Sequence, residues 1–201
     1  MDNLALLYYS QERYEDAELL NKLALTMLQE LFGDRHPSVA TSLNNLGLLY
    51  HSQEKYDEAE LIYLKALTIS QELLGDCHPD VAQTINNLAV MYISQRRYRE
   101  AEPMCLKNLK LRQELFGDCH PNVGESLHNL ARLYDSQGRH EEAGSLFQKA
   151  LLISEQILGV DHPDTIKTRI SYELCLKEKK RSPPKESKKK GFGSNRYLKN
   201  R

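Results

Sequence analysis

The chain repeats itself at a fixed interval of 42 residues, and this repetition constrains its fold more than any local motif does. Asparagine recurs at Asn3, Asn45, Asn87 and Asn129, tyrosine at Tyr8, Tyr50, Tyr92 and Tyr134, and alanine at Ala17, Ala59, Ala101 and Ala143. A period of this size indicates one supersecondary unit stacked on copies of itself. Because a single unit cannot bury its apolar face alone, we expect an elongated array with a continuous core. Such a shape suits a binding surface better than a catalytic pocket.

The apolar pattern within one repeat predicts two antiparallel helices. Apolar residues follow the spacing of an amphipathic helix over Ser38–Ser52 and again over Tyr56–Leu74. Only Gln53–Lys55 separates them, and so short a link makes the two helices antiparallel. Gly75 follows the second helix, where we expect the left-handed conformation of a helix C-cap. Pro79 is suited to open the next helix, because the first turn of a helix does not use its N–H groups.

This unit resembles the tetratricopeptide repeat. The positions typical of that motif are filled in the second repeat by Leu43, Leu46, Gly47, Tyr50, Ala59, Tyr63 and Ala66. The usual length of such a repeat is about 34 residues, and about eight more carry a Leu-Gly-Asp-x-His-Pro loop here. This long form resembles the repeats of kinesin light chains, nephrocystin-like proteins and large bacterial tetratricopeptide arrays. The resemblance covers about residues 1–165. It implies an all-α, right-handed tetratricopeptide solenoid of about four repeats with a C-terminal capping helix.

The register divides the chain into six segments. Repeats occupy 1–36, 37–78, 79–120 and 121–162, followed by a capping helix at 163–180 and a tail at 181–201. The first helix of repeat one is truncated, because Met1 aligns with Leu43. Segment 163–180 places Arg169, Tyr172 and Glu173 where earlier repeats carry apolar or small residues, so we expect a capping helix with a polar outer side. The tail holds few apolar residues, and we expect it to be disordered.

Charge is distributed unevenly along the chain. Residues 177–201 carry 11 Lys or Arg against 2 Asp or Glu, whereas 1–176 carry 16 basic and 26 acidic residues. An acidic body disfavours nucleic acid as a partner, because binding it requires neutralising phosphates. The clusters Lys179–Arg181 and Lys188–Lys190 flank Ser182-Pro183-Pro184, the layout of a two-cluster nuclear import signal. Contact with acidic surfaces and a purely solubilising role are the alternatives for this tail.

Composition also bears on the compartment. No run approaches the ~20 apolar residues of a membrane span, and the N-terminus lacks the pattern of a secretory signal. Cys77 and Cys119 occupy equivalent places in successive repeats, about 10 Å apart by helix packing, which is too far for a disulfide. We therefore expect a reducing, cytoplasmic environment, with association with the cytoskeleton if the kinesin light chain resemblance extends that far.

The concave side is the candidate binding site. In tetratricopeptide arrays the first helices line that side, and the resemblance to peptide-clamping members implies that the second Asn of each repeat points inward. Amides both donate and accept hydrogen bonds, so a row of them could hold the backbone of an extended peptide. The predicted peptide-binding residues are Asn3, Asn45, Asn87, Asn129, Asn44, Asn86, Gln83, Leu48, Val90 and Arg132, with further apolar contact from Tyr9 and Ile93. Alternatively, the Asn row ties neighbouring helices together.

No catalytic residue, metal site or cofactor is predicted. Four His-Pro pairs, at His36, His78, His120 and His162, contain potential metal ligands. Loops separated by a whole repeat do not bring four donors to one point, so each His is expected to help start a helix. Motifs for nucleophilic, phosphate-binding or metalloprotease chemistry are missing from the sequence. A small-molecule substrate is therefore not expected.

The sequence favours a non-catalytic adaptor or scaffold whose partner is a protein or peptide. If the kinesin light chain resemblance extends to function, the partner is a cargo adaptor in microtubule transport. The coiled-coil heptads by which a light chain joins its heavy chain are not in this sequence. The alternative is a regulatory repeat segment of a larger multidomain signalling or ciliary protein.

Overall fold

The computed structural model describes residues 7–11 and 13–181, and within these residues every regular element is an α-helix. Asn3 and the predicted disordered tail beyond Arg181 lie outside the described residues. Residues 7–10 are helical and precede α2 (Tyr14–Phe32), α3 (Pro37–Ser52), α4 (Tyr56–Leu74), α5 (Pro79–Ser94), α6 (Tyr98–Phe116), α7 (Pro121–Ser136), α8 (His140–Ile157) and α9 (Pro163–Arg181).

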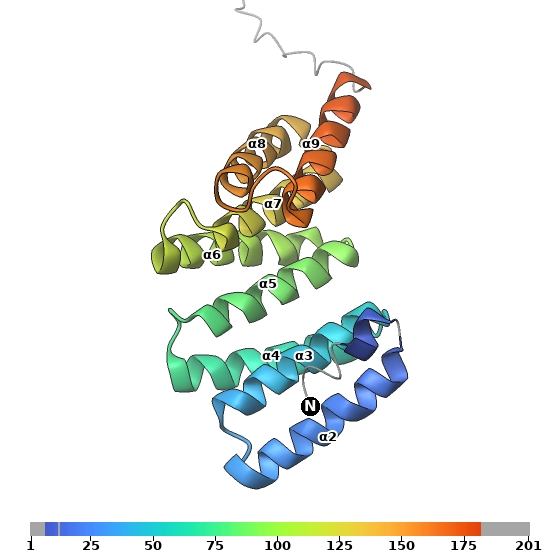
Figure 1. Ribbon diagram of the computed structural model, residues 1–201, viewed down its shortest axis with the longest axis vertical. Helices are drawn as coiled ribbons and strands as arrows, with labels where there is room; N and C mark the ends of the chain where they lie inside the picture. The colour runs from blue at the N-terminus through green and yellow to red at the C-terminus, as the bar shows by residue number, and fades with distance from the viewer. Residues whose placement is uncertain (1–6, 12, 182–201) are drawn as a thin grey trace, which may run out of the picture.

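The helices stack in sequence order into an elongated array with α2 and α9 at opposite ends (Figure 1). Each helix packs on the helices before and after it. The first helices of the repeats also contact one another, α3 with α5, α5 with α7 and α7 with α9. The predicted all-α stack of helix-turn-helix repeats is therefore confirmed.

The His-Pro pairs start the helices, as the sequence predicted. Each proline occupies the first turn, where its missing N–H costs no hydrogen bond. The histidine before it, extended at His36, His78 and His120, accepts a hydrogen bond at Nδ1 from the backbone N–H two residues later. The distances are 3.2 Å for His36, 3.1 Å for His78, 3.1 Å for His120 and 3.2 Å for His162. Each imidazole therefore satisfies a helix N-terminus of its own, which leaves its Nδ1 unsuited to a shared metal site.

Gly75 ends α4 in a conformation that differs from the expected one. Its φ of 80° is positive, as predicted, but its ψ of 169° lies far from the left-handed helical region. This combination falls in a region that is essentially restricted to glycine. Its N–H still reaches back to the carbonyl oxygen of Gln71, as a capping residue should. Gly33 and Gly117 end α2 and α6 in the same way.

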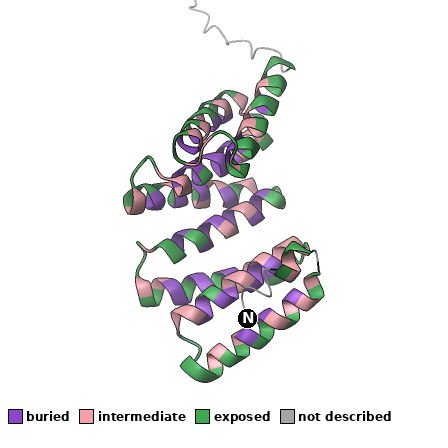
Figure 2. Ribbon diagram, viewed as in Figure 1, coloured by how far each residue is buried: buried purple, intermediate pink, exposed green. Residues whose placement is uncertain are grey.

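The core runs along the stack as a buried stripe shared by neighbouring helices (Figure 2). Alanine on the second helices allows close packing, since Ala59, Ala101 and Ala143 are completely buried. Gly47 has the same role on α3. A Cβ at that position would lie 2.7 Å from the fully buried ring of Tyr63 on α4. The motif glycine and tyrosine thus mark a close approach of the two helices that only glycine permits.

The turns between paired helices carry a repeated electrostatic contact. The basic residue just before each second helix pairs with a glutamate on the second helix of the preceding repeat, and it also lies over a tyrosine ring of its own repeat. The sets are Lys55 with Glu18 and Tyr50, Arg97 with Glu60 and Tyr92, and Arg139 with Glu102 and Tyr134. These side chains are partly exposed, so each ion pair contributes at most about 1 kcal/mol.

The last helix differs from its predicted character. Ile166, Ile170 and Leu174 are 41%, 52% and 55% exposed, and their spacing places them on one face of α9. Arg169 bonds to Glu155 of α8 at 2.8 Å. The exposed residues of α9 include charged ones such as Lys167 and Glu173, in keeping with the predicted polar outer side, but α9 also exposes an aliphatic stripe that was not predicted.

Gly75→Val should destabilise the array by about 1–3 kcal/mol through backbone strain. Nothing lies within 4 Å of a Cβ built at Gly75, so a steric clash would not contribute. Urea unfolding followed by circular dichroism measures the effect. Gly144→Ala is the matched control, because that helical glycine would bring its Cβ only to 4.0 Å from Tyr172. The control should match or exceed the wild type in stability. Equal midpoints for Gly75→Val and the wild type would contradict the assigned conformation.

Candidate functional site

A groove with a volume of ≈ 490 Å³ runs along the side of the stack formed by the first helices. Residues of α3, α5, α7 and α9 line it, together with Tyr9, Tyr63, Ser154 and Leu158. Its lining is apolar around Leu48 and Val90 and becomes polar and charged toward α7 and α9. The repeat thus brings residues that are a whole repeat apart in sequence to one continuous surface.

Most of the predicted binding residues lie in this groove. Its lining includes Leu48, Asn86, Asn87, Val90, Asn129 and Arg132 from the predicted set, and Tyr9 as well. Asn44, Asn45 and Gln83 lie on the same helices but outside the lining, and Asn3 lies outside the described residues. Ile93 is only 6% exposed and belongs to the core, so the expectation that it contacts a ligand was wrong.

The asparagine amides join neighbouring first helices. Asn87 Nδ2 donates to Asn44 Oδ1 at 3.1 Å, which links α5 to α3. Asn129 Nδ2 donates to Asn86 Oδ1 at 3.0 Å, which links α7 to α5. The first Asn of one repeat therefore accepts from the second Asn of the next. Each amide nitrogen carries two N–H groups, so these bonds leave a further donor on Asn87 and on Asn129.

Three more polar pairs extend this pattern. Two of them have the same separation of 43 residues as the asparagine pairs, one more than the repeat. We call these five pairs the polar seam. Its additional members are Tyr9 Oη with Ser52 Oγ at 2.7 Å, His51 Nε2 with Ser94 Oγ at 3.3 Å, and His128 Nδ1 with Thr168 Oγ1 at 3.1 Å. The last pair joins α7 to α9.

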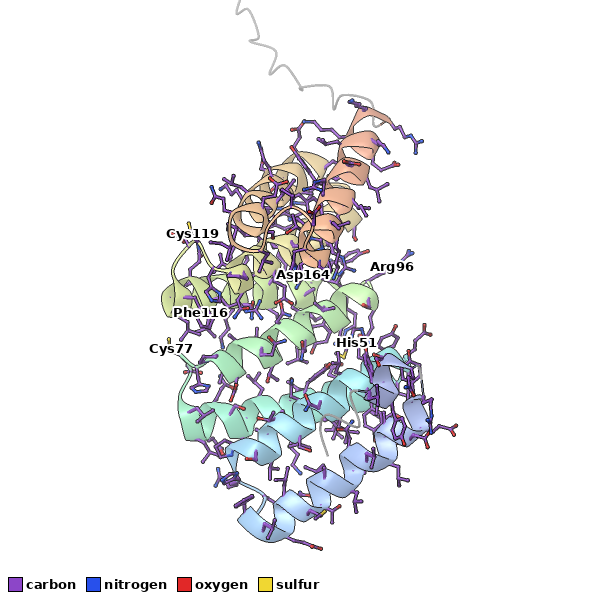
Figure 3. The ribbon with its side chains drawn as sticks, in the orientation of Figure 1. His51, Cys77, Arg96, Phe116, Cys119 and Asp164 are labelled. Atoms are coloured by element: carbon purple, nitrogen blue, oxygen red, sulfur yellow. The ribbon has the colours of Figure 1, made fainter. Side chains whose placement is uncertain are left out.

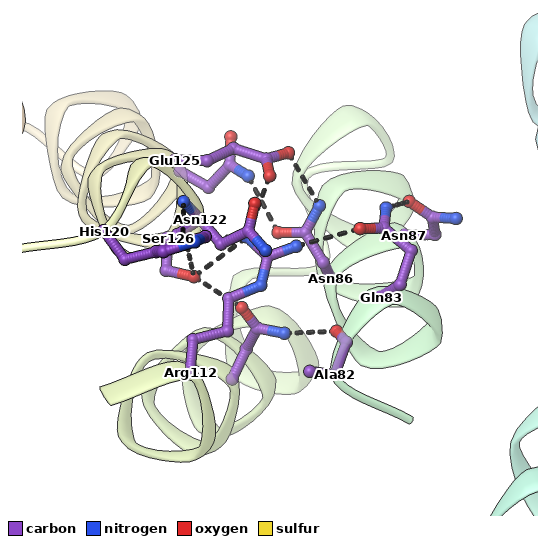
Figure 4. Close-up of polar contacts among 11 residues, drawn as sticks. Ala82, Gln83, Asn86, Asn87, Arg112, His120, Asn122, Glu125 and Ser126 are labelled. Carbon is purple, nitrogen blue, oxygen red and sulfur yellow. Dashed lines mark hydrogen bonds and ion pairs between the residues drawn. The ribbon is translucent and has the colours of Figure 1, made fainter. Parts of the chain in front are cut away.

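Arg112 of α6 supports the groove from behind. Its side chain is only 1% exposed, yet it carries a charge. Its guanidinium donates to Glu125 Oε2 at 2.8 Å and to Gln83 Oε1 at 3.0 Å, which connects it to α7 and α5 (Figure 4). Asn86 Nδ2 donates to the other oxygen of Glu125 at 3.0 Å, so this network is continuous with the polar seam. A buried arginine requires such partners, because an unpaired buried charge is strongly destabilising.

Arg112 was not predicted from the sequence. The signal was present in the register, since the equivalent residues of the two neighbouring repeats are Ser70 and Ser154, both buried, whereas repeat one has Leu28. An arginine between two repeats that hold a small buried residue at this position indicates a local polar network. Its partners come from two other helices, α5 and α7, so the sequence pattern could not identify them.

Positive charge collects at the α7–α9 end of the groove. Arg132 of α7 and Lys167 of α9 both line it, beside the acidic Glu125 and Asp164. His128 is 4% exposed in the same region, and its Nε2 has no partner in the described structure. Burial, reinforced by Lys167 and Arg132, lowers the pKa of His128 to about 4. The imidazole is therefore neutral at pH 7, and among the described residues the only cations that line this end are Arg132 and Lys167.

The remaining reactive groups lie apart from the groove. All four cysteines are free, and Cys77 and Cys119 project from loops at one edge of the stack (Figure 3).

None of the described helices combines the length and the hydrophobicity that crossing a bilayer requires.

Comparison with known proteins supports the repeat assignment. A family model described as tetratricopeptide repeat matches residues 1–72 and 80–143, more than half of the chain, and a second model of that description matches 123–164. Comparison with curated proteins gives no match.

Solved structures show the same fold. BtubC (BKLC) from P. vanneervenii is 28% identical, with a TM-score of 0.75 over 88% of this chain and 70% of that one. Two crystal structures of a Podosopora anserina putative kinesin light chain with nearly identical TPR-like repeats are 21% identical, with TM-scores of 0.74 and 0.73. Each match covers 90% of this chain and 85% of the other. At that identity the Podosopora structures support the fold alone.

The buried His128 should make the fold sensitive to acid. An unfolded histidine titrates near about 6.5, whereas folding lowers the pKa of His128 to about 4. Between these values the unfolded chain binds a proton that the folded chain does not. The stability from this residue is therefore fully present above pH ~6.5 and falls as the pH drops toward 4.

His128→Asn introduces the residue found at the equivalent positions Asn44 and Asn86 and removes the titrating group. Between pH 7 and pH 5, urea titrations should show the wild type losing about 2 kcal/mol more than this variant. Parallel losses in the two proteins would show that His128 is not the acid-sensitive group.

Proposed function

The chain belongs to the tetratricopeptide repeat family, and we propose that it is a non-catalytic adaptor or scaffold that holds a peptide segment of a partner protein in the groove. Tetratricopeptide domains are in general protein-interaction modules. The observation that carries the proposal is the position of the groove, which follows the first helices of successive repeats and so offers a track for an extended chain. Exposed polar side chains on a rigid concave scaffold also favour binding.

The apolar part of the track would receive side chains of the ligand. Leu48 and Val90 are half-buried, one repeat apart, and line the groove beside Tyr9. Transfer of apolar ligand groups onto this surface contributes roughly 25 cal/mol per Å² removed from water. This contact would supply affinity with little selectivity for sequence.

The asparagines would position the ligand backbone. Asn87 and Asn129 each use one N–H in the polar seam and keep a second, and both line the groove. Because the seam already fixes the orientation of these amides, a ligand would lose little side-chain entropy when it accepts from them. Main-chain carbonyl oxygens of a peptide are suitable acceptors, whatever its side chains are.

Charge would set the orientation of the ligand. Arg132 and Lys167 at the α7–α9 end favour an acidic residue or carboxylate there. Glu125 and Asp164 line the same end, so the site lacks the uniform basic charge of a clamp specific for acidic termini. We therefore infer a ligand with an acidic group near one end and apolar side chains elsewhere.

The 42-residue form of the repeats, which resembles that of kinesin light chains, favours a role of that type, in which the ligand would be a cargo adaptor in microtubule transport. The second candidate is a regulatory repeat segment of a larger signalling or ciliary protein. The aliphatic stripe of α9 favours that role, because it suits packing against a neighbouring domain of the same protein.

A peptide selection tests the groove directly. Random peptides displayed on phage are selected against the whole chain, and the recovered peptides are titrated against variants by fluorescence polarisation. A protein carrying both Leu48→Ser and Val90→Ser should lose binding, because the apolar part of the track disappears. The matched control carries Leu61→Ser and Leu64→Ser, two aliphatic residues exposed on α4 outside the groove lining. The control should bind like the wild type.

Two results would contradict the proposal. One is a selection that returns no peptide. The other is a set of peptides that lose affinity for the control variant with Leu61→Ser and Leu64→Ser and bind the variant with Leu48→Ser and Val90→Ser as they bind the wild type. Asn87 and Asn129 are less suited to this test, because replacing them would also remove the bonds between α3, α5 and α7.

A further inference from the structure

Three side chains that can ligate a metal meet where α7, α8 and α9 join. Asp135 lies in the last turn of α7, His140 begins α8, and Cys175 lies within α9. One ligand atom from each lies within 4.8 Å of the other two. His140 Nδ1 is 2.8 Å from Asp135 Oδ1, and Cys175 is completely buried. None of the three lines the groove, and no other such group occurs among residues 7–11 and 13–181.

The repeat register shows that packing does not require these residues. The place of His140 is taken by tyrosine in the three earlier repeats, and the place of Cys175 by large apolar residues. The equivalents are Tyr14, Tyr56 and Tyr98 for His140, and Leu49, Met91 and Leu133 for Cys175. One repeat earlier, the equivalent residues Tyr98 and Leu133 both contribute to the apolar core. The contact between the start of α8 and α9 therefore has two metal-binding side chains where the earlier repeats have apolar ones.

The third ligand, Asp135, and the turn that follows it also differ from the equivalent residues of the earlier repeats. Asp135 is equivalent to Ile93, and it is the only carboxylate among the residues at this position, Tyr9, His51, Ile93 and Asp135. Gly138 has φ 73°, where Glu54 and Arg96 adopt a positive φ of 59° in the equivalent turns. Glycine removes the strain of that conformation. Since this turn connects Asp135 to His140, the change occurs in the segment that positions both ligands.

The donor set identifies the class of metal. A thiolate, an imidazole and a carboxylate suit Zn²⁺, whereas Mg²⁺ and Ca²⁺ prefer oxygen ligands alone. Bonds of about 2.0–2.3 Å in a tetrahedron place ligand atoms roughly 3.3–3.6 Å apart. The present separations of at most 4.8 Å can reach these values by side-chain rotation. Water would complete the coordination as the fourth ligand.

Catalysis by the cysteine is a poorer explanation of the cluster. Cys175 Sγ is buried and donates to the carbonyl oxygen of His140 at 3.6 Å, so the ring nitrogens are not its partners. Burial, together with Asp135, raises the pKa of Cys175 to about 12. A buried neutral thiol is a weak nucleophile.

We propose that Asp135, His140 and Cys175 bind a Zn²⁺-type ion that fastens α9 to α7 and α8. Binding replaces the thiol proton, which passes to water, with a sulfur–metal bond, while His140 ligates as the neutral imidazole. The ion would then connect three helices that are otherwise held by packing, by the buried bond between His128 and Thr168, and by exposed pairs such as Lys179 with Glu141. Metal binding would thereby stabilise the end of the array.

Titration of the metal-free, full-length chain tests the site. Addition of Zn²⁺ should give one strong binding event per chain by calorimetry and raise the melting temperature. Addition of Co²⁺ should produce the absorption band of a cobalt–thiolate bond. His140→Tyr and Cys175→Leu install residues that occupy the equivalent positions of other repeats, so both variants should fold. Each should lose the stabilisation, and Cys175→Leu should also lose the cobalt–thiolate band.

The control carries Cys77→Ser and Cys119→Ser, which removes the exposed thiols next to His78 and His120. It should keep the full response to both metals. The proposal fails if the wild type binds no Zn²⁺. It also fails if binding persists in His140→Tyr and Cys175→Leu and disappears in the control, because the loop Cys-His pairs would then be the ligands.

Discussion

The structure depends on hydrogen bonds between first helices that are offset by one residue more than the repeat. Asn44 with Asn87, Asn86 with Asn129, and Tyr9 with Ser52 are all 43 residues apart. Apolar packing is non-directional and would tolerate small slips between repeats. A buried or half-buried pair of amides does not tolerate such a slip, because breaking its hydrogen bond leaves polar groups unsatisfied. The polar seam therefore fixes how each repeat sits on the last.

The same seam shapes the surface available to a ligand. It joins the first helices to one another and fixes the side-chain amides of Asn87 and Asn129, both of which line the groove. Buried Arg112 locks Gln83 and Glu125 into this arrangement from the opposite side. Structural support and the proposed ligand contact would thus be two uses of one row of amides. The two explanations offered for that row by the sequence are compatible, since each amide nitrogen has two hydrogens.

Periodic features could be predicted from the sequence, and singular ones could not. The helix bounds, the His-Pro caps and the grooved side follow from patterns that recur in each repeat. Arg112 and the aliphatic stripe of α9 occur once, and their environments depend on several helices together. Ile93 was misplaced because it follows the groove-lining Val90 by only three residues, a spacing that places both near one face of the helix, although Ile93 packs into the core. The cluster of Asp135, His140 and Cys175 was missed because its members are up to 40 residues apart.

The side-chain amide signals of Asn87 and Asn129 in a ¹⁵N-labelled sample give the most direct test of the central claim. In the free protein, one N–H of each amide should show the slow exchange and downfield shift of a hydrogen-bonded donor, and the other should exchange freely. Addition of a groove-binding peptide should shift and protect the second N–H while the first stays protected. Two freely exchanging N–H groups in the free protein, or amide signals that ignore the peptide, would contradict the account.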